Sequence, residues 1–196
     1  MKTFMIASAI SLSLAGAVSA ADFEQTGISL VLERDNLAFG IDTVDGEATT
    51  LTFGVAVLPH AVLGADADVT LGFECGVVTE ELTFSAAYGL SKHYGKVNVY
   101  GEVEAAYTVA PGETGGNWIT TPTIGAAYAV NDKLSAFGEV SYAWNVSDNW
   151  AREGGAVEVG ARYSLTDTVS LTPSIVRTFD TGSDATNFNL TVGVLF

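Results

Sequence analysis

The sequence predicts an all-β protein, an antiparallel up-and-down β-barrel of about ten strands, with eight as the alternative count. Three observations lead to this prediction. Apolar and polar residues alternate along many segments, tight turns alternate with long polar loops, and aromatic residues collect near the segment ends. The last ten residues, Asn187 to Phe196, alternate most regularly, and ten residues is the length a tilted strand needs to cross the hydrocarbon layer of a membrane.

The first 20 residues form a predicted secretory signal peptide. Lys2 precedes an apolar stretch from Phe4 to Val18, and Val18-Ser19-Ala20 supplies the small residues of a cleavage site. The predicted mature chain, residues 21 to 196, has 196 − 20 = 176 residues, enough for one domain. It contains no run of eighteen apolar residues, so if it spans a membrane it does so as a closed sheet, the β-barrel itself.

The composition fits a sheet and argues against several functions. Hydrophobic residues make up 48% and charged residues 16% of the chain, yet the apolar residues are dispersed and do not form helical stripes. The net charge of −15, or −16 without Lys2, makes nucleic acid and anionic substrates poor partners. With Cys75 as the single cysteine, the fold has no intrachain disulfide.

Alternating segments follow one another along the chain, and each is predicted to be a strand. They run from Gly27 to Glu33, Leu37 to Thr43, Thr50 to Val57, Asp68 to Glu74, Leu82 to Leu90, Val97 to Thr108, Thr123 to Val130, Leu134 to Asn145, Val157 to Leu165, Val169 to Ile175, and Asn187 to Phe196. The first two segments are either a hairpin or one long, kinked strand.

The connections between these segments are of two kinds. Asn131-Asp132 and Thr166-Asp167 are tight turns, whereas Ala110 to Asn117, Val146 to Gly154 and Asp180 to Thr186 are long and polar. Short turns at one end and long loops at the other are typical of an outer membrane barrel. Pairing Val130 with Leu134, and Leu165 with Val169, keeps the alternation intact across both turns.

Aromatic residues fall into two groups along the predicted strands. Tyr88, Tyr128 and Tyr163 lie near tight turns, whereas Tyr107 and Trp144 lie near the long loops. Amphipathic rings form two such belts at the two interfaces of a bilayer. The sequence therefore predicts a transmembrane β-barrel.

The terminal Phe196, the repeated Tyr-x-apolar ends, the Asn/Thr-Asp turns and the alternating return strands resemble the small bacterial outer membrane barrels of the OmpA/OmpX type and their porin-like relatives. The resemblance covers nearly all of Leu51 to Phe196. It implies a monomeric barrel in the outer membrane of a Gram-negative bacterium, in contact with outer membrane lipids. It also implies that the barrel-assembly machinery reads Phe196.

The resemblance further implies that both termini face the periplasm, which requires an even number of strands. Counting back from Phe196 gives ten strands with Leu37 to Thr43 as the first, or eight with Asp68 as the start. We prefer ten, with Gly27 to Glu33 as an extension or continuation of the first strand.

Five charged residues of the central strands all fall on the inward face. This placement supports the assigned faces, because charges cannot face lipid at low cost. The residues are Glu102, Glu104, Glu139, Glu158 and Arg162. These side chains either form a polar plug in a structural barrel or line a narrow, cation-preferring pore for small solutes. The alternative function is an envelope-stabilising or surface-recognition barrel with functional loops and no pore.

No enzyme, cofactor or metal site is predicted. The two histidines, His60 and His93, lie in predicted turns and have no convincing Ser partner nearby in sequence. Loop carboxylates such as Glu113 and Asp180 match no calcium-loop spacing, so we interpret them as a solvated surface.

Overall fold

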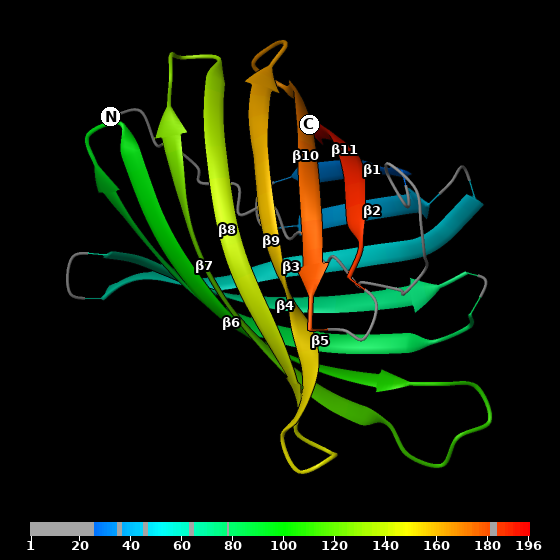
Figure 1. Cartoon of the computed structure of the whole chain (residues 1–196). Coiled ribbons are helices and arrows are strands. Elements are labelled where there is room, and N and C mark those ends of the chain that lie inside the picture. Colours follow the sequence, from blue (N-terminus) through cyan, green and yellow to red (C-terminus); the bar gives the residue numbers. More distant parts are fainter. Residues whose placement is uncertain (1–25, 35–36, 45–46, 63–64, 78, 181–183) are drawn as a thin grey trace.

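A computed structural model describes residues 26–34, 37–44, 47–62, 65–77, 79–180 and 184–196, so the predicted signal peptide lies outside the described residues. Eleven strands form a closed barrel in which each strand pairs with its neighbours in the chain and β1 pairs with β11 (Figure 1). The strands are β1 (Thr26–Arg34), β2 (Leu37–Val44), β3 (Glu47–Val62), β4 (Ala65–Gly76), β5 (Leu82–Tyr94), β6 (Val97–Val109), β7 (Asn117–Ala129), β8 (Leu134–Asn145), β9 (Ala151–Ser164), β10 (Val169–Phe179) and β11 (Thr186–Leu195). Within the described residues there is no helix long and apolar enough to cross a membrane.

The prediction of an all-β closed barrel is confirmed, but the strand count of ten or eight is wrong. Residues Gly27 to Glu33 belong to a separate strand, β1, which pairs as an antiparallel hairpin with β2. On its other side β1 pairs with β11 in parallel, with Thr26 beside Phe188 and Leu32 beside Val194. The segment has an apolar face and a small or polar face, as the other strands have, and its backbone groups pair with β2 on one edge and with β11 on the other.

The odd number of strands places the start of the first strand and the end of the last strand at opposite ends of the barrel. Because β1 and β11 run in the same direction, β1 begins at the long-loop end, where β11 also begins, and β11 finishes at the short-turn end. The prediction that the first strand starts where the last strand ends is therefore wrong. The remaining strand pairs are antiparallel.

The two tight turns have the register that the sequence predicts. The amide of Val130 donates to the carbonyl of Leu134, and that of Leu165 donates to Val169, both at 2.9 Å. A side chain holds each turn: Asn131 Oδ1 accepts hydrogen bonds from the amides at 133 and 134, and Thr166 Oγ1 accepts from those at 168 and 169. Asn and Thr stand at these positions because their short polar side chains can close such turns.

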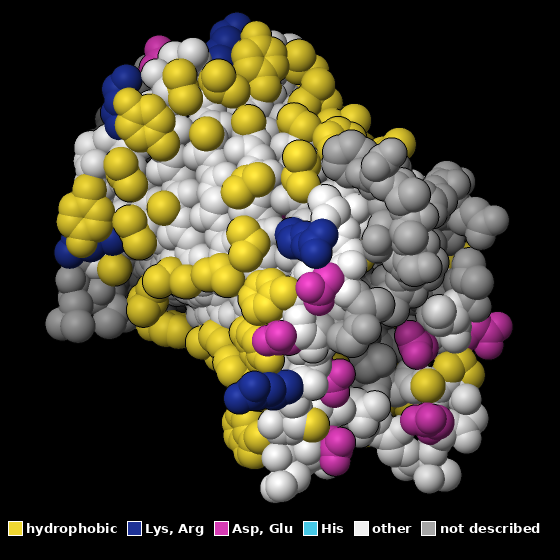
Figure 2. Space-filling view, in the orientation of Figure 1, with side chains coloured by type: hydrophobic (Ala, Val, Ile, Leu, Met, Phe, Trp, Pro, Cys, Tyr) yellow, Lys and Arg dark blue, Asp and Glu magenta, His cyan; other side chains and the backbone are white. Residues whose placement is uncertain are grey.

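The distribution of polar and apolar residues is the reverse of that in a water-soluble core. The buried polar or charged residues are Thr70, Glu74, Thr83, Glu158, Ser174 and Thr178, whereas the buried hydrophobic ones are only Ala67, Val176 and Ala185 among the described residues. Large apolar side chains are exposed on every strand from β1 to β11. Figure 2 shows hydrophobic side chains over the outer wall of the sheet. The outer surface is therefore apolar and the interior polar.

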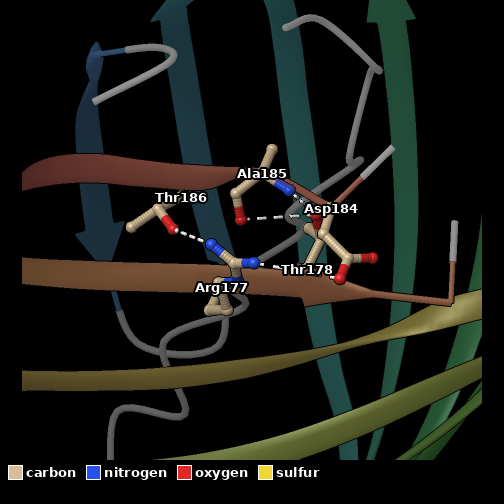
Figure 3. Close-up of polar contacts among 5 residues, drawn as sticks. All are labelled: Arg177, Thr178, Asp184, Ala185 and Thr186. Atoms are coloured by element: carbon tan, nitrogen blue, oxygen red, sulfur yellow. Dashed lines mark hydrogen bonds and ion pairs between the residues drawn. The ribbon is translucent and has the colours of Figure 1, made fainter. Parts of the chain in front are cut away.

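The loop between β10 and β11 is tied to its strands by side chains (Figure 3). Arg177 donates to Thr186 Oγ1 at 2.9 Å and lies 3.8 Å from a carboxylate oxygen of Asp184. Thr178 Oγ1 accepts from the amide of Ala185 at 2.9 Å. Because Arg177 and Asp184 are both about half exposed, this ion pair contributes little to stability. The buried hydrogen bond of Thr178 is the firmer tie.

Candidate functional site

The barrel interior gathers most of the charged residues of the strands. Residues paired across neighbouring strands share a face, and the face that carries the buried Glu158 is the interior. Glu158 pairs with Glu139, and Glu102 pairs with Thr123 and Gly89. Following this register places all five charged residues of the sequence analysis on the inner face: Glu102, Glu104, Glu139, Glu158 and Arg162.

Four more carboxylates lie on the same face and were not predicted as site residues. These four are Glu33 on β1, Asp42 on β2, and Asp68 and Glu74 on β4, and a fifth, Asp66, lies on the same face at the exposed short-turn end of β4. The alternation of β4 could have identified Asp68 and Glu74, whereas Glu33 and Asp42 lie in segments whose pairing was ambiguous. Arg162 is the single Lys or Arg on the inner face of the described strands.

Seven of these carboxylates form what we call the acidic track: Asp42, Asp68, Glu74, Glu102, Glu104, Glu139 and Glu158. Glu102 interacts electrostatically with Glu104, Asp68 and Glu139. Glu139 in turn interacts with Glu158, and Glu74 interacts with Asp42, Glu104 and the loop residue Glu81. The track therefore extends from the long-loop end into the middle of the barrel.

The interior has few cations to balance this charge. Arg162 interacts with Glu33 near the short-turn end, where both strands finish. Glu139 and Glu158 face each other directly across β8 and β9, an arrangement of like charges that destabilises a sheet. A lumen lined in this way has a strongly negative potential and attracts cations from solution.

Hydroxyl groups support several of the carboxylates. Ser85 hydrogen-bonds Glu104, Ser174 hydrogen-bonds Glu158, and Ser29 hydrogen-bonds Asp42. Glu74 differs, because only 8% of its surface is exposed and its Oε2 has no hydrogen-bond partner in the protein. Glu74 Oε2 is therefore a buried polar atom whose loss of hydration no protein hydrogen bond offsets.

Two aromatic rings narrow the interior by lying over glycines. The Tyr100 side chain from β6 crosses Gly125 on β7, and its hydroxyl donates to Glu139 Oε2 on β8 at 2.7 Å. Phe137 covers Gly160 on the next strand in the same way. A Cβ atom at either glycine would overlap the ring above it. These glycines therefore permit the rings to lie flat against the wall.

The substitution Gly125→Ala is expected to destabilise the barrel by about 1–3 kcal/mol, because the added methyl displaces Tyr100 from Glu139. Denaturant unfolding followed by tryptophan fluorescence measures the change. Gly138→Ala is the matched control, since a Cβ there meets its nearest atoms at an ordinary 3.7 Å. Equal destabilisation by both substitutions would show that the Tyr100 contact is not the cause.

The predicted interface aromatics lie on the outer face. Tyr128 and Tyr163 are exposed near the short-turn ends of their strands, whereas Tyr88, predicted beside a turn, is exposed at the middle of β5 because that strand continues to Tyr94. Near the long loops, the ring centroids of Tyr107 and Trp118 lie 4.9 Å apart, and those of Trp144 and Tyr142 lie 4.7 Å apart. The rings thus occupy both ends of the wall.

The C-terminal Phe196 closes the seam between β11 and β1. Its amide donates to the carbonyl of Glu33 at 3.0 Å, and the guanidinium of Arg34 lies 6.0 Å from the ring centroid. The ring remains 64% exposed, so it is accessible to another molecule.

His60 and His93 belong to strands β3 and β5, not to turns as the sequence had suggested. Among the described residues, no three His, Cys, Asp or Glu side chains are grouped closely enough to hold a metal ion. The carboxylates are spread along the wall. No protein-family model matches the chain, and no curated protein matches its sequence.

Proposed function

We propose that the protein is an integral outer membrane β-barrel of the OmpA/OmpX-like, porin-like kind, and that its acidic interior passes small cations. The observation that carries the proposal is the reversed burial pattern, with Glu74, Thr83 and Glu158 buried inside and large apolar side chains exposed outside. Contiguous apolar surface on this scale is unfavourable in water and favourable in lipid. A closed barrel also leaves no unpaired sheet edge in the hydrocarbon layer.

The dimensions of the barrel are compatible with a narrow passage. Eleven strands spaced ~4.8 Å apart and tilted by ~40° give a backbone radius of ~11 Å. Many inward positions carry small residues, such as Gly72, Ser85, Ala87 and Gly193. The space between the side chains is then lined by hydroxyls and by the acidic track, which favours hydrated cations over anions.

Location and assembly follow from the same proposal. The signal peptide, residues 1 to 20, directs the chain across the inner membrane, and the barrel-assembly machinery reads the exposed Phe196. The barrel domain of residues 21 to 196 then contacts outer membrane lipids as a monomer, binds no nucleic acid and catalyses no reaction.

Surface recognition is the second candidate function, and the loop between β8 and β9 favours it. Trp150 is 60% exposed and has a left-handed backbone, with φ of 63°. The amide of Trp118 and Ser147 Oγ are hydrogen-bonded at 2.8 Å, which holds the loop in place. Non-glycine residues with such backbone angles are over-represented at binding sites. Loss of binding to cells or phage on replacing this loop would identify that role.

The channel function is tested by reconstituting the purified protein in a planar bilayer. Under a tenfold KCl gradient, the expected reversal potential has the sign of cation selectivity and approaches the limit of about 59 mV for a monovalent ion. A shift in the gel mobility of the protein from the outer membrane fraction on boiling is expected to accompany it. Absence of conductance with an intact, inserted barrel would leave the non-conducting alternative.

A further inference from the structure

The outer face of the short-turn end carries a group of basic side chains beside tyrosines. We call it the lysine rim, and it consists of Lys92, Lys96 and Lys133 with Tyr94 and Tyr128. Lys96 Nζ donates to the carbonyl of Val130 at 3.4 Å, so the β5–β6 and β7–β8 turns lie together. Lys92 Nζ lies 5.8 Å from the centroid of the Tyr94 ring. The three lysines thus lie on or beside two neighbouring turns at the same end of the barrel.

The ion pair between Arg177 and Asp184 lies at the opposite end of the barrel and involves none of these lysines. Asp132 in the β7–β8 turn and Asp66, which pairs with Ser91 beside Lys92, are the acidic residues next to the three lysines, and they leave an excess of positive charge. The long-loop end is acidic instead. Its carboxylates include Glu80, Glu81, Glu113, Asp148 and Glu153.

The charge therefore divides between the two ends of the barrel. Figure 2 shows dark blue side chains along the upper-left rim and most of the magenta ones at the lower right. The short-turn rim also has the most exposed tyrosine of the cluster, Tyr94 at 61%. Tyrosine rings beside lysines are typical of the depth at which lipid headgroups meet the hydrocarbon layer.

We infer that the lysine rim binds the phosphate headgroups of anionic phospholipids in the leaflet at the short-turn end. This inference rests on the proposed membrane location. Three ammonium groups at headgroup depth attract anionic lipid, by up to about fivefold for each lysine. Tyr128 lies deeper in the wall than Lys96 and Lys133, whereas Lys92 lies two residues deeper than Tyr94 and its ammonium group reaches back toward that ring. The acidic loops repel the same lipids, so the preference belongs to one leaflet.

The inference is tested in phosphatidylcholine vesicles that hold the intact barrel and a trace of spin-labelled lipid. The electron spin resonance spectrum reports how much labelled lipid is immobilised at the protein surface. Labelled phosphatidylglycerol is expected to associate at least ~5-fold more strongly than labelled phosphatidylcholine, and less so in high salt. In the triple variant Lys92→Gln, Lys96→Gln, Lys133→Gln the preference is expected to disappear.

Arg152→Gln, which removes a base at the long-loop end, is the matched control and is expected to keep the preference. Equal association of both lipids with the unaltered barrel, or a preference retained by the triple variant, would overturn the inference. A barrel that enters the vesicles in either case leaves the proposed function intact. A protein that immobilises neither lipid and stays outside the vesicles would instead contradict the membrane location itself.

Discussion

Replacing Glu102, Glu139 and Glu158 together with glutamine is expected to move the reversal potential of the reconstituted barrel toward zero. The three side chains interact with one another or with their neighbours along the acidic track, so removing them lowers the negative potential of the lumen over most of its length. Glutamine has nearly the same shape and keeps an oxygen for the Tyr100 hydroxyl. The measurement is the reversal potential under a tenfold KCl gradient, where full cation selectivity gives about 59 mV.

The control for this experiment changes carboxylates that lie outside the lumen. Glu113 and Glu153 are exposed residues at the long-loop end. Their replacement with glutamine is expected to leave the reversal potential nearly unchanged in high salt, because exposed charges are screened there. A selectivity that persists in the lumen variant, or that is lost equally in the loop variant, would show that the acidic track does not select ions.

The inner and outer faces of β3 to β11 could be predicted because a strand has a period of two and consecutive strands pair in order. Glu139 and Glu158, separated by nineteen positions in the sequence, face each other in the structure as their alternation required. The turn residues Asn131 and Thr166 carried local information about register. The faces of the strands and the register at these turns depend on residues close together in the chain, so they can be predicted from the sequence pattern.

The strand pair that closes the barrel could not be predicted in this way. The pairing of β1 with β11 joins the two ends of the chain, and nothing local in Thr26–Arg34 specifies a parallel partner. The predicted segments before and after residue 60 were too short, since β3 continues to Val62 and β4 begins at Ala65. The register shift between Val57 and His60 interrupts the alternation there. The overlap of Tyr100 with Gly125 is likewise a contact between strands that the period of two does not show.

Val159→Lys is expected to destabilise the barrel in a bilayer by about 2–4 kcal/mol, because in the proposed membrane location the ammonium group faces lipid near the middle of the wall. Val159 is 53% exposed on β9, and its register partners Gly138 and Ile175 lie within the lengths of β8 and β10. The free energy of unfolding in lipid vesicles, from urea titration, measures the loss.

The control, Leu165→Lys, has similar exposure at 46% but lies at the short-turn rim. A lysine there reaches the headgroups, so the expected cost is only about 0–1 kcal/mol. The contrast between the two sites depends on the surrounding solvent. In a barrel that folds in water, both lysines replace an exposed apolar side chain with a hydrated one, and both substitutions leave stability within about 0.5 kcal/mol. Equal, small effects at Val159 and Leu165 would therefore mean that the apolar wall does not face lipid, whereas a loss of about 2–4 kcal/mol at Val159 alone exceeds the cost of about 1 kcal/mol that strand propensity can explain and supports hydrocarbon around the middle of the barrel.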